Sequence, residues 1–482
     1  MKLKDPGLLR EAAFVAGAWR PVRNDGATVS NPANGERVGE QPMLALAEVE
    51  QAIESAHAAF GAWREHTGKE RAAVLRRWAD LVMANADDLA WIMTAEQGKP
   101  LAEARGEIAY AASFLEWFGE EAKRGYGHTI PEPRRGQRIK VIKEPLGVCA
   151  AITPWNFPSA MVTRKVAPAI AAGCTVLLKP APQTPFSALA LCVLAERAGL
   201  PQGVLSVLTG EARMIGEAFC ESHLIRKISF TGSTAVGKSL MANAAGTLKK
   251  LSLELGGNAP FIVFDDADVE AAVAGAKASK FRNAGQTCVC VNRFFVQRGI
   301  HDAFVARLKA AVADLRVGDG YAEGTTIGPL VNHAAVEKVE RLVMQAIDAG
   351  ATADLVVRAP AGGSFYAPTV LTGVQPSMQI SREEIFGPVA AITRFDTEDE
   401  VIRLANATRY GLAAYVYTQN MRRGHRIERE LEYGIIGVNE GLISTEVAPF
   451  GGVKESGFGK EGSFYGLDEY LDSKYICHGG VA

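Results

Sequence analysis

Gly147-Val-Cys-Ala-Ala-Ile152 begins the stretch that decides the fold. A second apolar run, Cys174-Thr-Val-Leu-Leu178, follows it after a segment with helical character at 162–172. The alternation continues to residue 253, with strands expected at 204–208, 227–230 and 250–253 and helices at 186–198, 213–220 and 234–245. Short apolar strands that alternate with amphipathic helices are typical of βαβ units. The stretch therefore predicts a parallel sheet that is covered by helices on both faces.

The flanking regions extend this pattern in both directions. Apolar residues at helical spacing predict helices at 44–66, 69–98 and 100–123. A second α/β series is expected after Gly256-Gly257, which marks the main boundary at 256–258. Its strands are expected at 261–264, 293–296, 390–395, 413–417 and 434–439, with a helix at 302–315. The basic, alternating segment 124–146 predicts a hairpin, with which residues 466–476 could pair.

Composition excludes several classes of function. The chain has 482 residues, which favours two or three domains. Its net charge of −2 offers no positive field for a nucleic acid. No secretory signal and no apolar run of about 18 residues is found, so we expect no membrane partner and a cytoplasmic location. Seven cysteines, without zinc spacing, predict neither a disulfide framework nor a metal site.

Two residues are typical of covalent catalysis at a carbonyl carbon. Cys288 lies in Arg282-Asn-Ala-Gly-Gln-Thr-Cys-Val-Cys290, among small and amide residues that disfavour a buried core position. Glu254 lies in Leu253-Glu-Leu-Gly-Gly-Asn258, beside two glycines. They are candidates for a nucleophile and a base. A core thiol and a solvated carboxylate remain the alternatives.

Other polar residues follow the expected strands, where parallel sheets bind ligands. Asn156 could donate to an oxyanion, and Lys179 follows the second strand. In Phe230-Thr-Gly-Ser-Thr-Ala-Val-Gly237, Gly232 permits close approach, and Ser233 or Thr234 could cap a helix whose N–H groups could bind a phosphate. The glycine spacing is not the usual dinucleotide fingerprint. A structural asparagine, a solvated lysine and an ordinary turn stay open as alternatives.

Taken together, these motifs resemble the NAD(P)-dependent aldehyde dehydrogenases over essentially the full length. The matching segments are Thr153–Pro158, Lys179–Ala181, Phe230–Thr234, Leu253–Asn258, Gly285–Cys288, Glu384–Pro388 and Pro449–Lys454. The resemblance implies an α/β fold, aldehyde dehydrogenase-like, with two Rossmann-type domains and a small β oligomerisation element. Residues 1–123 and 146–255 would bind the cofactor and 256–455 would form the catalytic domain. Residues 124–145 and 456–482 would join protomers into a homodimer or homotetramer.

The resemblance also assigns catalytic roles. Cys288 would attack the aldehyde, and Asn156 with the backbone N–H of Cys288 would hold the oxyanion. Glu254 would activate the water that hydrolyses the thioester. Lys165 and Glu461 match a proton relay behind this base. The presence of Glu254 and Glu461 separates the chain from relatives that pass the acyl group to coenzyme A.

A further set of matched residues would bind the cofactor, either NADP or NAD. These residues are Trp155, Lys179, Pro182, Gly232, Ser233, Leu255, Glu384 and Phe386. Strictly NAD-using relatives often carry a glutamate where this chain has Pro182, so a 2′-phosphate is not repelled here.

Among these enzymes the chain is most similar to the succinate-semialdehyde dehydrogenases. Arg164, Arg282 and Ser444 match the residues that bind the distal carboxylate of the substrate. Arginine offers a planar fork to a carboxylate, which a fatty-aldehyde tunnel would not need. A glutarate-semialdehyde or broad-specificity enzyme, a structural role for either arginine, and a non-catalytic family member are the alternatives.

Cys290 follows the expected nucleophile by two residues. It is either a passive neighbour or the partner in a reversible disulfide with Cys288. The geometry of so short a bridge is the obstacle to the disulfide.

Overall fold

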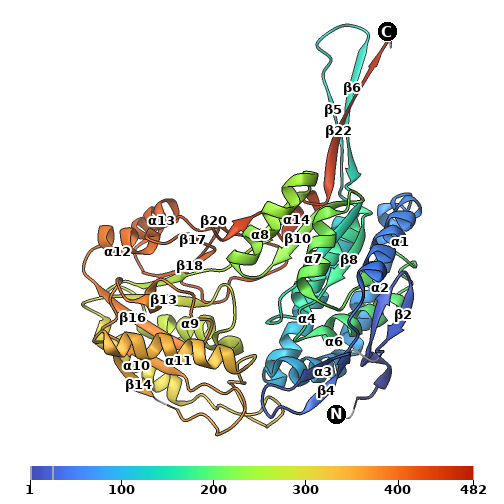
Figure 1. Cartoon of the computed structure of the whole chain (residues 1–482). Helices are drawn as coiled ribbons and strands as arrows, with labels where there is room; N and C mark the ends of the chain where they lie inside the picture. The colour runs from blue at the N-terminus through green and yellow to red at the C-terminus, as the bar shows by residue number, and fades with distance from the viewer. Residues whose placement is uncertain (1–2, 24–25, 356, 481–482) are drawn as a thin grey trace.

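The computed structural model describes residues 3–23, 26–355 and 357–480. Figure 1 shows two α/β parts side by side and a long arm of three strands that projects from the first part. None of the helices in these ranges combines the length and the apolar character that crossing a membrane requires.

The first part is built on a sheet of eight strands. Its five central strands, β9, β8, β7, β10 and β11, run parallel. The strands β1, β2 and β21 at the edges pair antiparallel. In spatial order the strands are β2 (Ala18–Pro21), β1 (Ala12–Val15), β9 (Leu205–Val207), β8 (Thr175–Lys179), β7 (Val148–Ile152), β10 (Ile225–Thr231), β11 (Lys250–Glu254) and β21 (Gly457–Phe458). The predicted parallel sheet is confirmed.

Helices cover both faces of this sheet, as expected for strands that are apolar on both sides. One core contains residues of α2, α4, α5 and α6, and a second contains residues of α1, α7 and α8. The helices are α1 (Leu46–Arg64), α2 (Gly68–Ala84), α3 (Ala86–Gln97), α4 (Leu101–Glu121), α5 (Ala160–Ala172), α6 (Pro185–Arg197), α7 (Ala212–Glu221) and α8 (Thr234–Ala244), with the short η1 (Pro6–Leu8) and η2 (Ala245–Thr247).

One expectation about the N-terminal region is corrected, and four strands are added to it. A single helix over 69–98 is wrong, because Asn85 leaves the helical conformation and its side chain donates to the Leu81 carbonyl, ending α2. The helices are also preceded by the hairpins β1–β2 and β3 (Ala27–Ser30)–β4 (Arg37–Gln41). These strands are short, and Ala16 and Gly17 take positive φ between the first two.

The second part is a sheet of seven strands in which only β14 pairs antiparallel. In spatial order the strands are β14 (Thr352–Leu355), β15 (Thr369–Thr372), β16 (Val389–Phe395), β13 (Val291–Gln297), β12 (Ala259–Val263), β18 (Ala413–Tyr417) and β19 (Ile435–Val438). The helices α9 (Val269–Phe281), α10 (His301–Ala313) and α11 (His333–Asp348) share one core, and α12 (Glu398–Asn406) and α13 (Met421–Glu430) share another. The short elements are η3 (Arg282–Gly285), η4 (Gln379–Ser381), β17 (Tyr410–Gly411) and β20 (Val453–Lys454).

The arm confirms the expected hairpin. β5 (His128–Ile130) and β6 (Gln137–Pro145) pair antiparallel, and β22 (Leu471–Gly479) pairs with β6 along its full length. The expected partner segment 466–476 is partly wrong, because its first residues belong to α14 (Ser463–Asp468). β21 also lies outside the arm, since it extends the first sheet beside β11.

Candidate active site

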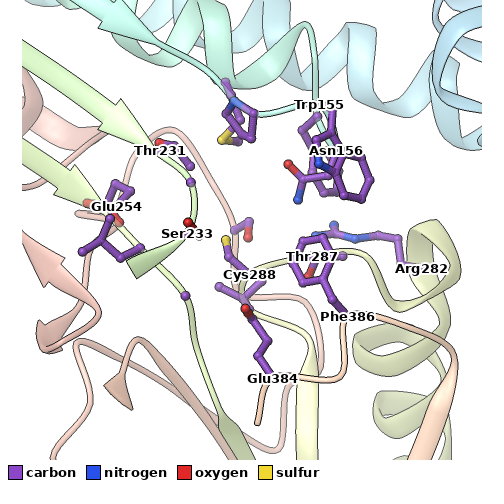
Figure 2. A pocket seen from close by; sticks show the side chains of 18 of the residues that line it. Trp155, Asn156, Thr231, Ser233, Glu254, Arg282, Thr287, Cys288, Glu384 and Phe386 are labelled. Carbon is purple, nitrogen blue, oxygen red and sulfur yellow. The ribbon is translucent and has the colours of Figure 1, made fainter. Parts of the chain in front are cut away.

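A pocket of about 290 Å³ lies where the loops after β7, β10 and β11 meet loops of the second part. Figure 2 shows Glu254 and Arg282 on opposite sides of Cys288, with Asn156 above the thiol. The expected site residues that line the pocket are Trp155, Asn156, Arg164, Gly232, Ser233, Glu254, Leu255, Arg282, Cys288, Glu384, Phe386 and Ser444. The expected residues outside the lining are Lys165, Glu461, Lys179, Pro182 and Cys290. The structure therefore brings together residues that are far apart in the sequence.

Cys288 lies in the loop between η3 and β13, shortly after three consecutive left-handed residues of η3. Asn283, Ala284 and Gly285 have φ of 51°, 54° and 75°. A Cβ at Gly285 would lie 2.3 Å from the Gly387 carbonyl oxygen, so the loop requires glycine there. Burial raises the pKa of the Cys288 thiol to about 12, although Arg164 opposes this shift. The thiol is partly exposed to the pocket and protonated at neutral pH.

The side chain of Asn156 is fixed on the loop that follows β7. Its Nδ2 donates to the Gln286 carbonyl at 2.9 Å, two residues before Cys288. An amide nitrogen carries two hydrogens, so a second one remains for a ligand in the pocket. The expected donor is therefore held against the loop that carries the expected nucleophile.

Glu254 ends β11 with its carboxylate buried and 2% of the residue exposed. Neither carboxylate oxygen has a hydrogen-bond partner among the described residues. Burial, followed by the charge of Glu461, raises the pKa of this carboxyl well above its ordinary value. An unpaired buried carboxyl is costly to keep, which is typical of a functional group.

Behind Glu254, two consecutive cations on α5 contact one carboxylate. Lys165 Nζ donates to Glu461 Oε1 at 2.5 Å and to Ser229 Oγ at 3.1 Å. Arg164 Nε lies 3.6 Å from Glu461 Oε2. The residues expected to form a proton relay are thus in direct contact.

The cofactor-side residues lie at the ends of β8 and β10. Ser233 is the N-cap of α8 and accepts from the Val236 N–H, and Gly232 precedes it. Lys179 ends β8, and burial lowers the pKa of its ammonium to about 8, against the opposing charge of Glu211. The N-terminus of α8 fits an anionic phosphate, and the buried lysine adds a positive charge at the same edge of the sheet. Pro182 is exposed nearby and presents no carboxylate.

Glu384 and Phe386 approach the pocket from the second part. Glu384 Oε1 accepts from the Gly257 N–H at 3.1 Å, and burial raises the pKa of the carboxyl to about 7. Phe386 has a φ of 56°, which is rare for an aromatic residue. Its ring lies edge-on to Trp155 with centroids 5.6 Å apart. These contacts fit a pocket wall that holds a flat ring, with Leu255 also in the lining.

The other end of the pocket is basic and aromatic. The Arg164 guanidinium lies 4.2 Å from the Phe450 ring and donates to the Tyr110 hydroxyl. Arg282 lies 5.3 Å from the Phe157 ring. Within the described ranges, the Arg282 guanidinium makes no hydrogen bond or ion pair, so its donors remain available to a ligand.

Sequence reasoning missed the aromatic side chains that enclose the two arginines. Tyr110 comes from α4, Phe157 from the loop after β7, and Phe450 from the loop before β20. Phe157 and Phe450 lie inside motifs that were singled out for other residues. Tyr110 lies in a helix whose periodicity predicts only packing, so no local signal distinguished it.

The sulfur of Cys290 is directed away from the pocket lining. Its Sγ lies 3.4 Å from the Lys280 carbonyl and 3.5 Å from the Val291 carbonyl. Both Cys288 and Cys290 are free thiols in this structure. A disulfide between them stays a prediction. Elsewhere in the described ranges, no cluster of His, Cys, Asp or Glu could hold a metal ion.

The fold and pocket are those of an oxidoreductase with a cysteine at the junction of two α/β parts. The model of the aldehyde dehydrogenase family matches residues 19–476. The chain belongs to the aldehyde dehydrogenase family.

Individual relatives match over nearly the whole length. The glutarate-semialdehyde dehydrogenase of Pseudomonas aeruginosa is 58% identical, with 100% of both chains covered. The NADP(+) succinate-semialdehyde dehydrogenase of Escherichia coli is 55% identical, with 99% of this chain and 100% of the relative covered. The crystal structure of succinate-semialdehyde dehydrogenase from Burkholderia pseudomallei is 58% identical with a TM-score of 0.98, covering 99% of this chain and 100% of that one.

Proposed function

We propose that this aldehyde dehydrogenase oxidises succinate semialdehyde to succinate, with NADP+ or NAD+ as the oxidant. The observation that carries the choice of substrate is the unpaired Arg282 guanidinium beside the buried Arg164. Together with Ser444 they form one polar end of the pocket, where Tyr110, Phe157 and Phe450 also line the wall. A distal carboxylate satisfies both guanidinium groups at that end while the aldehyde reaches Cys288.

The first half of the reaction forms a covalent bond to the enzyme. Cys288 gives its proton to solvent water and its sulfur bonds to the aldehyde carbon, while the carbonyl electron pair moves to oxygen. Asn156 Nδ2 and the backbone N–H of Cys288 stabilise that oxyanion. A bound nicotinamide would supply the acceptor for the hydride of this carbon, whose C=O bond re-forms as the hydride leaves. The acyl group then remains on Cys288 as a thioester.

The second half releases the acid. Glu254 takes a proton from a water molecule whose oxygen bonds to the acyl carbon. The C–S bond breaks, the carboxylic acid leaves, and the Cys288 thiolate takes a proton back from solvent water. Glu461 and Lys165 carry the proton from Glu254 toward solvent. The buried, unpaired carboxyl of Glu254 supports this role.

The residues around the cofactor side support a pyridine dinucleotide. Ser233 and the N-terminus of α8 would hold a phosphate, Lys179 the adenosine ribose, and Glu384 the nicotinamide ribose. Pro182 leaves room for a 2′-phosphate, which supports the use of NADP+ as well as NAD+. The arm of β5, β6 and β22 has exposed strands that join protomers into a homodimer or homotetramer.

Glutarate semialdehyde is the second candidate, because a relative of equal similarity is named for it. The two substrates differ by one methylene, which a pocket distinguishes by only about 1–3 kcal/mol. A broad-specificity aldehyde dehydrogenase would not need the two arginines.

A panel of aldehydes tests the proposal. Formation of reduced cofactor is followed with succinate semialdehyde, glutarate semialdehyde and butyraldehyde, each with NADP+ and NAD+. We expect kcat/KM to be at least about 100-fold higher for the two carboxylated aldehydes. A kcat/KM that is higher for glutarate semialdehyde than for succinate semialdehyde selects the second candidate. A kcat/KM for butyraldehyde equal to those of the carboxylated aldehydes contradicts the proposed substrate class.

A further inference from the structure

The backbone carbonyl of Asn156 is held by two side chains from other segments. Lys99 Nζ donates to it at 2.8 Å, and Asn283 Nδ2 donates to it at 3.0 Å. All three residues are buried. Asn156 is therefore fixed through its backbone as well as through its own amide.

Asn283 also contacts the carbonyl to which the Asn156 side chain donates. Its Nδ2 lies 3.2 Å from the Gln286 carbonyl, the same oxygen that accepts from Asn156 Nδ2 at 2.9 Å. One amide group thus contacts both the carbonyl of Asn156 and the atom that orients the Asn156 amide. Removing it would loosen both constraints on the direction of that amide.

Asn283 is itself held in one orientation. Gln97 Nε2 donates to Asn283 Oδ1 at 3.0 Å, which fixes the nitrogen of the amide toward Asn156. The backbone N–H of Asn283 donates to Glu103 Oε2 at 2.8 Å. Its φ of 51° and ψ of 37° lie in the left-handed region, where asparagine is favoured over most other residues.

Lys99 provides the second clamp. Its ammonium is paired with Glu107, and Glu107 Oε1 in turn accepts from the backbone N–H groups of Ser159 and Ala160 at the start of α5. The loop from β7 to α5 is therefore held both at the Asn156 carbonyl and at the point where α5 begins. A buried ion pair of this kind is poor evidence for added stability and better evidence for a fixed arrangement.

We propose that Asn283 is a positioning residue that acts through Asn156 by aiming its amide at the oxyanion. The inference rests on the role proposed above for Asn156. Because Asn283 directly follows Arg282, the residue that contacts the distal carboxylate and the residue that orients the oxyanion donor are neighbours in η3. A shift of η3 would change both contacts together.

Two variants separate the side chain from the backbone. Asn283→Gly keeps the left-handed conformation, which glycine adopts without strain, and removes the amide. Asn283→Asp keeps shape and conformation, but turns a carboxylate oxygen toward two carbonyl oxygens. We expect each to lower kcat about 10- to 100-fold, the scale of a displaced catalytic group, with little change in KM for the cofactor.

A double-mutant cycle with Asn156→Ala is the decisive measurement. Loss of one oxyanion donor costs about 10²- to 10³-fold in kcat. If Asn283 acts through Asn156, Asn156→Ala with Asn283→Gly will be no slower than Asn156→Ala alone. Multiplication of the two losses overturns the inference, as does an unchanged kcat for Asn283→Gly.

Asn406→Ala is the matched control for losing a bridging amide. Its Nδ2 donates to the Glu430 carbonyl and its Oδ1 accepts from the Glu432 N–H, and it does not line the pocket. We expect a lower melting temperature without the loss in kcat, so an equal kcat loss in this control contradicts the inference. If Asn156→Ala alone leaves kcat unchanged, the proposed oxyanion role fails, and the positioning role fails with it. If Asn156→Ala lowers kcat but the two losses multiply in the double variant, only the positioning role is overturned.

Discussion

Arg164 Nε lies 3.6 Å from Glu461 Oε2, so one of the expected substrate anchors already faces a carboxylate of the protein. Both side chains are almost fully buried. Lys165, the next residue on α5, contacts the other oxygen of Glu461. Arg164 therefore belongs both to the substrate end of the pocket and to the residues behind Glu254, whereas Arg282 serves only the substrate end. The two arginines should respond differently to substitution.

Arg282→Met removes a guanidinium that has no partner of its own in the described chain. We expect KM for succinate semialdehyde to rise about 10- to 100-fold, because a charged hydrogen bond contributes about 1.5–3 kcal/mol. The KM for butyraldehyde should stay within about twofold of that of the unsubstituted enzyme, since butyraldehyde has no carboxylate to bind. Steady-state kinetics with both aldehydes measure the difference. Equal losses on both would contradict a carboxylate anchor.

Arg164→Met should affect turnover and stability, and not only the binding of the carboxylated substrate as Arg282→Met does. It leaves Glu461 paired with Lys165 alone and removes the cation between the Phe450 and Phe114 rings. We expect kcat to fall for charged and uncharged aldehydes alike, and stability to fall by about 3 kcal/mol, as when one partner of a buried pair is removed. Chemical denaturation and the same aldehyde pair test this. An effect confined to KM for the carboxylated substrate would contradict the coupling to Glu461.

Glu254→Gln separates the two halves of the reaction. Formation of the thioester needs Cys288 and Asn156, so one equivalent of reduced cofactor should still appear rapidly. Turnover after that burst should fall about 10²- to 10⁴-fold, the usual contribution of a general base. A rapid-mixing experiment that resolves the burst from the steady state measures this. Loss of the burst itself would assign Glu254 to the first half instead.

The pH dependence of hydrolysis follows from the same residue. The pKa of Glu254 is raised by burial and by Glu461, so the carboxyl is protonated below that raised pKa and active as a base above it. The rate of turnover after the burst should therefore rise with pH through a range well above the ordinary pKa of a glutamate. Glu254→Gln should lose this rise. A rate that already reaches its plateau near pH 5 would contradict the role.

Lys179 predicts how cofactor choice depends on pH. Its pKa is lowered to about 8 by burial, so the ammonium is charged at pH 7 and neutral above pH 9. KM for NADP+ should rise over this range more than KM for NAD+, because only NADP+ carries the 2′-phosphate. Lys179→Met should remove the difference. Pro182→Glu should raise KM for NADP+ selectively by adding a negative charge at the same place.

The strand ends explain why much of the site could be predicted from the sequence. Asn156, Lys179 and Glu254 end or follow short apolar strands, and such positions converge at one edge of a parallel sheet. The predicted alternation of strands and helices was enough to bring them together. The Cys288 loop was identified by its small and amide residues, although its three left-handed residues could not be inferred.

What the sequence did not reveal depends on contacts between distant segments. Lys99 lies between two expected helices and Glu107 within the second, and their role is visible only once α4 packs against the loop after β7. Tyr110 likewise reaches the pocket from a helix that otherwise packs in the core. The N-terminal strands were missed because strands of four or five residues have little periodicity to detect.

The raised pKa of Cys288 predicts how the thiol reacts in the free enzyme. Burial raises the pKa to about 12, Arg164 lowers it, and Glu384 and Glu254 raise it further. The thiolate fraction, and with it the rate of alkylation by iodoacetamide, should increase about tenfold per pH unit from pH 7 to pH 10. Arg164→Met should slow the reaction at every pH in this range, and Glu384→Gln should accelerate it, because each removes one of these charges. The measurements are made in a Cys477→Ala background, because the Cys477 thiol is exposed, and Cys290→Ala serves as the control, since that sulfur is buried outside the pocket lining. Alkylation that is fast and independent of pH around neutrality would mean that Cys288 is already a thiolate, and would contradict the protonated resting state.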